Sequence, residues 1–153
     1  MDKTVKENSA ILTYYSHSID DTAYLAQKIA DRLKGGEVIL LNGQLGAGKT
    51  AFTKCLAKSL GVVEEVTSPT FAFMKEYQGK FPLYHFDLYR VGDEDELYEL
   101  GLSEYLYSGG VCVIEWNKFE EVQNPIVIDI SIPDNASGDE DRKFVVKGVN
   151  LEF

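Results

Sequence analysis

The N-terminal part of the chain carries the hydrophobic spacing of an amphipathic helix. Leu25, Ile29 and Leu33 follow one another every four residues, with alanines beside them, which gives a helix one apolar stripe. The polar run 16–21 stands before this stripe and offers side chains that cap a helix, and a glycine pair closes it. The pattern predicts a strand over 10–15, followed by a helix that packs on a core.

Two short apolar runs are typical of strands that are buried on both faces. Residues 37–42 (EVILLN) and 111–114 (VCVI) lack the alternation of a half-exposed strand, and a glycine precedes each run. A helical pattern over 49–60 follows the first run after a glycine-rich turn and ends at Gly61. A buried strand that leads into a helix predicts a parallel sheet with helices packed against it.

Alternating apolar residues predict antiparallel strands in the rest of the chain. The runs 70–77 and 81–88 are joined by a Gln-Gly-Lys turn, which is typical of a β-hairpin. The run 126–132 alternates cleanly, and 142–149 is its expected partner across a polar loop. The predicted fold is therefore α/β, with a mixed sheet of parallel core and antiparallel edge strands and with helices on both faces.

Length and composition fit one domain over 1–153. The 153 residues are 44% hydrophobic and 26% charged, which is enough apolar surface to form a core without a disulfide or a structural metal. No apolar run approaches the roughly 20 residues that cross a bilayer. The first residues also lack the apolar stretch of a secretory signal. These features predict a soluble, cytoplasmic protein that has no membrane partner.

The formal net charge of −10 is unevenly distributed. Residues 61–153 hold 19 of the 25 acidic side chains but 7 of the 15 basic ones. Such a surface repels a phosphate backbone, so direct binding of nucleic acid is not expected. Part of the acidic excess lies in 93–107, which is predicted to form one or two short helices with an outward acidic face, or a docking surface for a basic partner. Cys55 and Cys112 have apolar neighbours and are predicted to be buried core thiols.

The most specific motif lies between the first buried strand and the helix after it. Residues 43–50 (GQLGAGKT) fit the P-loop pattern G-x-x-x-x-G-K-[ST], which a chain of this length matches by accident in roughly one of 200 sequences. In this setting backbone N–H groups face an anion, Lys49 reaches the β- and γ-phosphates of a nucleotide, and Thr50 binds Mg²⁺. The residues expected to bind the nucleotide here are Gly43, Gln44, Leu45, Gly46, Ala47, Gly48, Lys49, Thr50 and Ala51. A plain glycine-rich turn is the alternative interpretation.

Nucleotide hydrolysis also requires a carboxylate near the metal. Glu115 directly follows a buried apolar run, where P-loop enzymes place the Walker B acid, and it is predicted to contact Mg²⁺ directly or through water. Asp87 is the second candidate acid, at the metal or the attacking water, unless it pairs with Arg90. His85 shares a strand face with Asp87 and is interpreted as packed more readily than as a base. Trp116 lines either the nucleotide site or the core.

The segment Ser68-Pro69-Thr70-Phe71 opens the predicted hairpin. P-loop switch proteins place at such a loop a hydroxyl that senses the γ-phosphate, which makes Thr70 a candidate catalytic residue. The same four residues also fit a plain turn.

Five segments, in this order, resemble one family. They are GQLGAGKT at 43–50, SPTF at 68–71, HFDLYR at 85–90, ELYELGLSEYL at 96–106 and IEW at 114–116. Their order and spacing are similar to those of the TsaE (YjeE) family, the ATPase component of bacterial tRNA threonylcarbamoyladenosine biosynthesis. Gln44 and Asn117 depart from the residues that are usual in that family, outside the P-loop consensus.

The resemblance implies a P-loop NTPase fold that binds ATP with Mg²⁺ and hydrolyses it to ADP. It also implies a complex with TsaD and TsaB, which transfer threonylcarbamoyl to adenosine 37 of ANN-decoding tRNAs. The chain would then meet tRNA only through the complex and would turn over ATP weakly alone. By resemblance, Asp87 is the essential acid, Thr70 lies in a switch-like loop and Trp116 follows the metal-side glutamate. The segment that approaches the adenine is matched by Ser18, Asp20 and Thr22.

Three other functions remain open from the sequence. Residues 117–120 (NKFE) resemble an incomplete N-K-x-D guanine signature, which would make the protein a small GTPase. A small-molecule kinase would need more arginines than the three in this chain, because such kinases neutralise the transferred phosphate with arginine. A nucleotide-sensing module that does not hydrolyse would keep the P-loop but would not require Asp87 or Glu115.

Overall fold

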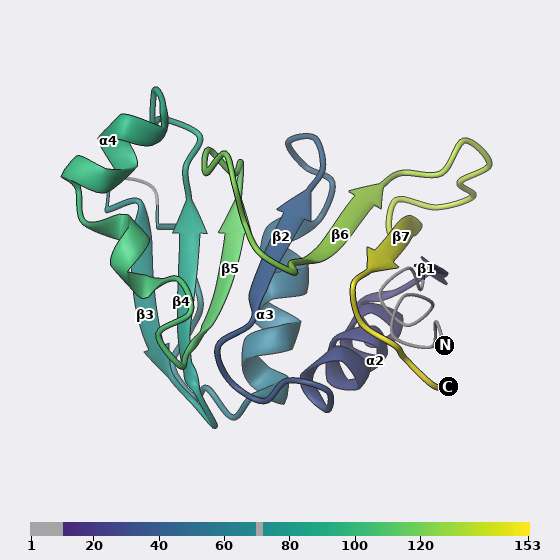
Figure 1. The fold of residues 1–153 in the computed structure, drawn as a ribbon. Coiled ribbons are helices and arrows are strands. Elements are labelled where there is room, and N and C mark those ends of the chain that lie inside the picture. Colours follow the sequence, from purple (N-terminus) through teal and green to yellow (C-terminus); the bar gives the residue numbers. More distant parts are fainter. Residues whose placement is uncertain (1–10, 70–71) are drawn as a thin grey trace, which may run out of the picture.

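A computed structural model describes residues 11–69 and 72–153 of the protein. Seven strands form one mixed sheet in the order β1-β7-β6-β2-β5-β4-β3 (Figure 1). The strands are β1 (Ile11–Ser16), β2 (Val38–Asn42), β3 (Met74–Gln78), β4 (Pro82–Asp87), β5 (Val111–Glu115), β6 (Ile126–Ser131) and β7 (Arg142–Lys147). The helices are α2 (Ile19–Ala30), α3 (Lys49–Ser59) and α4 (Glu94–Glu99), with the 3₁₀ helix η1 (Leu102–Tyr105) after α4.

The centre of the sheet is parallel. β2 pairs with β5 on one side and with β6 on the other, and β5 also pairs with β4. In this register Leu41 lies opposite Glu115, and Glu115 lies opposite Asp87. The carboxyl ends of β2, β5 and β4 therefore meet at one edge of the sheet, where the loop after β2 begins.

Antiparallel strands flank this centre on both sides, as predicted. β3 and β4 form the expected hairpin at one end of the sheet. At the other end β7 runs antiparallel to β6, and β1 runs antiparallel to β7. The parallel pairing of β6 with β2 is not predicted from the sequence. The alternation of 126–132 is the same for an edge strand and for a strand that lies beside β2.

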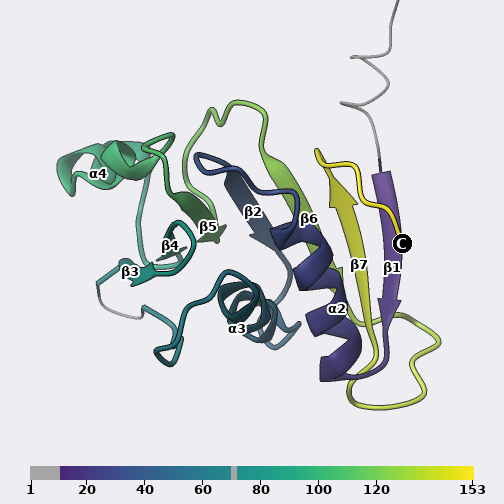
Figure 2. The ribbon, with the colours of Figure 1, turned by 90° about the horizontal axis from the view of Figure 1, so that it is seen from below.

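Helices cover both faces of the sheet, as predicted (Figure 2). α2 and α3 lie on one face, where Ile29 and Leu56 pack on strand residues such as Ile39 in one buried cluster. α4 and η1 lie on the other face, where Leu97 and Leu102 belong to a second buried cluster. No helix in the described ranges is both long and apolar enough to span a membrane.

Capping side chains set the beginning of α2 and α4. Ser18 has extended backbone angles and its side chain accepts a hydrogen bond from the Asp21 amide at 3.2 Å, while Asp93 accepts one from the Glu96 amide at 3.1 Å. The acidic segment 93–107 forms two short helices, α4 and η1, which agrees with the sequence prediction, and the chain breaks between them at Gly101, whose φ of 73° lies in the left-handed region. α2 ends at Ala30, earlier than the glycine pair at 35–36 suggests.

The two cysteines differ in burial. Cys112 is fully buried in β5, and burial raises the pKa of its thiol to about 12. Cys55 is only partly buried and lines a groove between α2 and α3, although burial still raises its pKa. The prediction of a core thiol is correct for Cys112 and is too strong for Cys55, because the helical register of α3 turns Cys55 toward this groove.

The same substitution at two valines tests the core. Val113 in β5 is fully buried, whereas Val63 is 98% exposed. Val113→Ala is expected to lower the free energy of unfolding by about 2 kcal/mol, through lost apolar burial and an unfilled cavity. Val63→Ala is expected to change it by less than about 0.5 kcal/mol. Urea denaturation measures both, and equal effects of the two substitutions would contradict the described core.

Candidate functional site

Two glycines shape the ends of the loop between β2 and α3. A Cβ on Gly43 would lie 2.7 Å from the backbone oxygen of Ile130 in β6, which is closer than any side chain tolerates. Gly48 has a φ of 110° and stands directly before α3. The first glycine brings the loop against the sheet edge and the second turns the chain into the helix.

The N-terminus of α3 differs from those of the other two α-helices in the described ranges. α2 and α4 begin with a capping side chain and carry acidic residues in their first turn. α3 begins after Gly48 with no side-chain cap and no acidic residue in the first turn. Its first amides and the positive end of its dipole are therefore available to an anion.

A pocket of about 280 Å³ opens at this helix end. One wall comes from the P-loop and α3, namely Leu45, Gly46, Gly48, Lys49, Thr50 and Ala51. The opposite wall is formed by Ser68, Asp87, Glu115 and Trp116. The fold thus brings together most of the residues predicted from separate motifs. Gly43, Gln44 and Ala47 belong to the same loop but do not line the pocket, and Thr70 lies outside the described residues.

Lys49 is held between the loop and the opposite wall. Its ammonium donates a hydrogen bond to the Gly43 carbonyl and lies 3.9 Å from the centre of the Trp116 ring. Burial lowers the pKa of Lys49, while the nearby charges of Glu115 and Asp87 act to raise it. The contacts described for the Lys49 ammonium are with a neutral carbonyl and a ring, so among the residues that the structure describes it has no hydrogen-bonded carboxylate partner that an anion would have to displace.

Asp87 is fixed at the end of β4 by the loops around it. One carboxylate oxygen accepts a hydrogen bond from the Tyr89 amide at 3.1 Å, and the other accepts one from the Ser68 hydroxyl at 3.3 Å. The side chain is partly exposed, in contrast to Glu115. Ser68 belongs to the SPTF segment, but the sequence predicts a site role there only for Thr70, because the contact of Ser68 with Asp87 depends on the tertiary fold.

Glu115 and Trp116 stand at the end of β5. The Glu115 carboxylate is 2.6 Å from Nε2 of His85, which is buried behind it in β4. Trp116 has a φ of 56°, an uncommon value for a non-glycine residue, and its ring meets the Tyr89 ring edge-on at 4.9 Å. The chain bends at Trp116, and its indole faces the Lys49 ammonium.

Arg142, at the start of β7, braces the P-loop from outside the pocket. Its Nε donates to the Ala47 carbonyl at 2.8 Å, and one terminal nitrogen donates to the Gly46 carbonyl at 3.5 Å. The other terminal nitrogen donates to the carbonyls of Asp139 and Asp141 at 2.7 and 2.8 Å. These bonds tie two P-loop carbonyls to the start of β7, and a hydrogen bond of 3.0 Å from the Ala47 amide to the Gln44 carbonyl closes the loop on itself. No sequence signal identifies Arg142, because it is distant from the motif along the chain.

The residues matched to the adenine segment are divided between two hollows. Ser18 and Thr22 line a hollow of about 130 Å³ that adjoins Gly48 and Ala51, with Arg142 on its far side. Asp20 instead lines the groove of about 620 Å³ between α2 and α3. Of the two, the hollow of Ser18 and Thr22 is the one that adjoins Gly48 of the P-loop.

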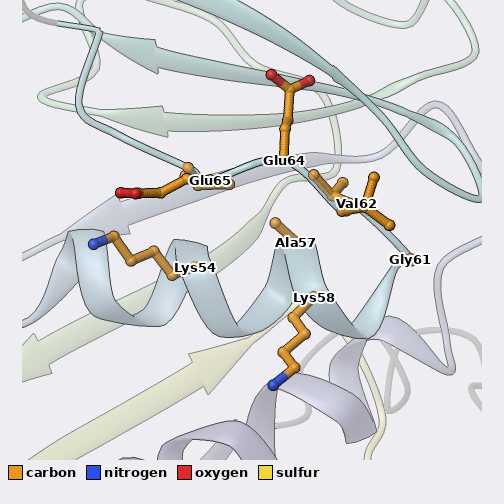
Figure 3. Close-up of a pocket in the computed structure, with 9 residues that line it drawn as sticks. Lys54, Ala57, Lys58, Gly61, Val62, Glu64 and Glu65 are labelled. Atoms are coloured by element: carbon orange, nitrogen blue, oxygen red, sulfur yellow. The ribbon is translucent and has the colours of Figure 1, made fainter.

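A further hollow of about 550 Å³ lies between α3 and residues 61–66 (Figure 3). Lys54 and Lys58 of α3 and the acidic pair Glu64 and Glu65 surround it, together with valines. None of its residues belongs to the P-loop pocket, and the mixed charges around it do not favour a phosphate.

The residues of the incomplete guanine signature serve the fold. The Asn117 side chain bonds the backbone of Phe119 twice, at 2.9 and 3.1 Å. The Lys118 ammonium donates to the carbonyls of Leu88 and Val91 at 3.2 and 2.9 Å. Neither residue lines the P-loop pocket. The geometry therefore gives no support to a GTPase signature at this position.

Comparison with known proteins agrees with this site. A family model described as threonylcarbamoyl adenosine biosynthesis protein TsaE matches residues 16–144. The chain belongs to the TsaE family. A TsaE protein of Bacillus subtilis is 44% identical over 135 residues, which are 88% of this chain and 84% of that protein. A TsaE protein of Aquifex aeolicus is 47% identical over 122 residues, which are 76% of this chain and 84% of that protein.

Solved structures extend the agreement to the fold. The crystal structure of Bacillus subtilis YdiB superposes with a TM-score of 0.75 at 34% identity, covering 93% of this chain and 88% of that one. The family resemblance and the α/β P-loop fold predicted from the sequence are thereby confirmed. TsaE proteins are named for tRNA threonylcarbamoyladenosine biosynthesis, and this chain is a member of that family.

The contact between His17 and Asp141 predicts two shifted titrations. Their side chains are 3.0 Å apart, and this bond raises the pKa of His17 and lowers the pKa of Asp141 to about 2. The stability from His17 is present below pH 6.5 and is lost as the pH rises through its raised pKa. The stability from Asp141 is present above pH 3.8 and is lost as the pH falls toward 2.

NMR titration of the two histidines measures the first of these shifts. Asp141→Asn should return the pKa of His17 toward 6.5. Asp139→Asn, in the same loop, should leave it raised. An unchanged His17 pKa in the Asp141 variant would contradict the contact.

Arg142 also makes a testable prediction about the P-loop. Hydrogen bonds from a charged donor contribute roughly 1.5–3 kcal/mol, so Arg142→Ala should speed amide hydrogen exchange in residues 44–48 by at least about tenfold. Lys143→Ala is the matched control, because Lys143 points to the other sheet face. Equal exchange in both variants and in the wild type would show that Arg142 does not brace the loop.

Proposed function

We propose that this TsaE-family protein binds ATP with Mg²⁺ in the P-loop pocket and hydrolyses it to ADP and phosphate. One observation carries the proposal: the uncapped end of α3, with Lys49 and Thr50, faces Asp87 and Glu115 across one pocket of about 280 Å³. Amides and a cation on one wall suit phosphates, and carboxylates on the other wall suit a metal and a water molecule.

The pocket residues fit Mg²⁺, which prefers oxygen ligands and keeps several waters. The Thr50 hydroxyl and the Glu115 carboxylate line the same pocket and would hold the ion, directly or through water. Within the described ranges no three His, Cys, Asp or Glu side chains form a metal cluster, so phosphate oxygens would complete the coordination. When bound, the ion neutralises charge on the β- and γ-phosphates.

The other residues take roles that follow from their positions. The Lys49 ammonium would leave the Gly43 carbonyl for the phosphates. Asp87, partly exposed and held by Ser68, would accept a hydrogen bond from the attacking water or from a water on the metal. Trp116 would border the phosphates. The adenine would lie toward the hollow of Ser18 and Thr22, with Asp20 more remote.

The family assigns the chain to threonylcarbamoyladenosine biosynthesis, and we propose that it acts there with TsaD and TsaB in the cytoplasm. Among the residues described in the pocket, Lys49 supplies the cationic side chain. Phosphoryl transfer usually employs additional positive charge, so a partner that completes the site would accelerate hydrolysis. The acidic surface argues that the partners, rather than this chain, hold the tRNA.

Phosphate release with ATP and GTP, with and without the TsaD–TsaB pair, tests the proposal. ATP turnover that the pair stimulates is expected. Asp87→Asn and Glu115→Gln should each lower it by about 100-fold or more, the size expected for loss of a positioned acid, while nucleotide binding persists. Glu121→Gln, an exposed acid outside the pocket, is the control.

Three outcomes would contradict the proposal. A preference for GTP over ATP would favour the alternative that the protein is a GTPase. ATP turnover that neither acid substitution changes would show that Asp87 and Glu115 do not act in hydrolysis. Binding without turnover, even with the pair present, would identify a nucleotide-sensing module.

A further inference from the structure

A histidine is buried directly behind the acids of the pocket. His85 in β4 is 0% exposed, and its Nε2 lies 2.6 Å from a carboxylate oxygen of Glu115, which is itself 4% exposed. In the parallel register His85 lies opposite Val113, and Asp87 lies opposite Glu115. His85 and Val113 each precede these acids by two residues, so all four side chains lie on the same face of the sheet. The ring therefore approaches Glu115 from the interior, whereas the pocket lies on the other side.

The Glu115 carboxylate lies where a charge is costly. It is almost fully buried, and Asp87, a second acid, stands opposite it in the neighbouring strand. A carboxylate that is buried beside another carboxylate needs a strong hydrogen-bond donor to remain in one orientation. The Lys49 ammonium is engaged with the Gly43 carbonyl and the Trp116 ring. The His85 ring gives Glu115 a donor that the core keeps fixed.

Nδ1, the other ring nitrogen of His85, shows that burying a histidine here destabilises the fold. Within the described ranges, Nδ1 of His85 is the fully buried side-chain nitrogen or oxygen that has no hydrogen-bond partner. An unsatisfied buried polar atom destabilises the folded protein, and an apolar residue at this position would avoid that loss. Packing alone therefore does not account for a histidine here, whereas its contact with Glu115 does.

We infer that His85 is a positioning residue for Glu115. Nε2 donates to one carboxylate oxygen and so directs the other oxygen into the pocket, toward the side where Thr50 lies. His85 touches neither the pocket nor its contents, and it acts only through Glu115. The inference rests on the proposed function, because it assigns to His85 the orientation of the carboxylate that would hold Mg²⁺, directly or through water.

Three substitutions separate positioning from packing. His85→Leu fills the space without a donor. His85→Gln places an amide N–H at a reach close to that of Nε2, and His85→Asn keeps a polar side chain that is too short to reach Glu115. The leucine and asparagine variants should therefore behave alike, and the glutamine variant should resemble the wild type. If the leucine variant fails to fold, the asparagine variant still tests the loss of the hydrogen bond to Glu115.

The first readout is the affinity of the protein for ADP, measured by calorimetry once with Mg²⁺ present and once with EDTA in place of Mg²⁺. Loss of a residue that orients a metal ligand costs about 10- to 100-fold in metal affinity. His85→Leu and His85→Asn should weaken binding by about that factor with Mg²⁺, and they should change it less than about twofold with EDTA. Equal losses in both conditions, or wild-type affinity in the leucine variant, would overturn the inference.

The orientation of Glu115 in crystal structures of the variants is the second readout, and it does not depend on nucleotide. The carboxylate should turn away from its wild-type position in the asparagine variant and keep that position in the glutamine variant. An unchanged Glu115 in the asparagine variant would overturn the inference on its own. Absence of nucleotide binding by the wild type would instead reject the proposed function.

Discussion

The parallel pairing of β2, β5 and β4 is the constraint on which the site depends. Its register sets Leu41, Glu115 and Asp87 side by side at the carboxyl edge of the sheet, just where the P-loop leaves β2. A shift of one residue in either pairing would move an acid to the opposite face, because side chains alternate along a strand. The two buried clusters fix this register, since they bury opposite faces of the same strands.

The antiparallel ends of the sheet support the pocket from two sides. The β3–β4 hairpin at one end contributes Asp87 and, behind it, His85. At the other end β7 brings Arg142 to the outer carbonyls of the P-loop, and the preceding Asp141 joins His17 before α2. Arg142 bonds backbone carbonyls of the P-loop, and His85 contacts Glu115 from its buried side. The pocket side of the P-loop and of Glu115 is therefore left free for a ligand and its metal.

Features that are encoded locally could be predicted from the sequence, and features that depend on tertiary register could not. The P-loop, the buried strand before Glu115 and the hairpin carry their own glycine, apolar and turn signals. The brace from Arg142 and the contact between His85 and Glu115 have no such signal, because they join distant segments. Burial depends on helical register in the same way, which explains why Cys55 is partly exposed and why Asp20 lines a different groove from Ser18 and Thr22.

The proposed function requires that the uncapped end of α3 and the acids opposite it form the nucleotide site. A crystal structure with Mg²⁺ and a non-hydrolysable ATP analogue tests this claim most directly. We expect phosphates within hydrogen-bond distance of the amides of residues 46–50 and of the Lys49 ammonium, with the metal beside Thr50 and on the Glu115 side of the pocket. A nucleotide bound in the groove between α2 and α3, or in the hollow beside residues 61–66, would contradict it.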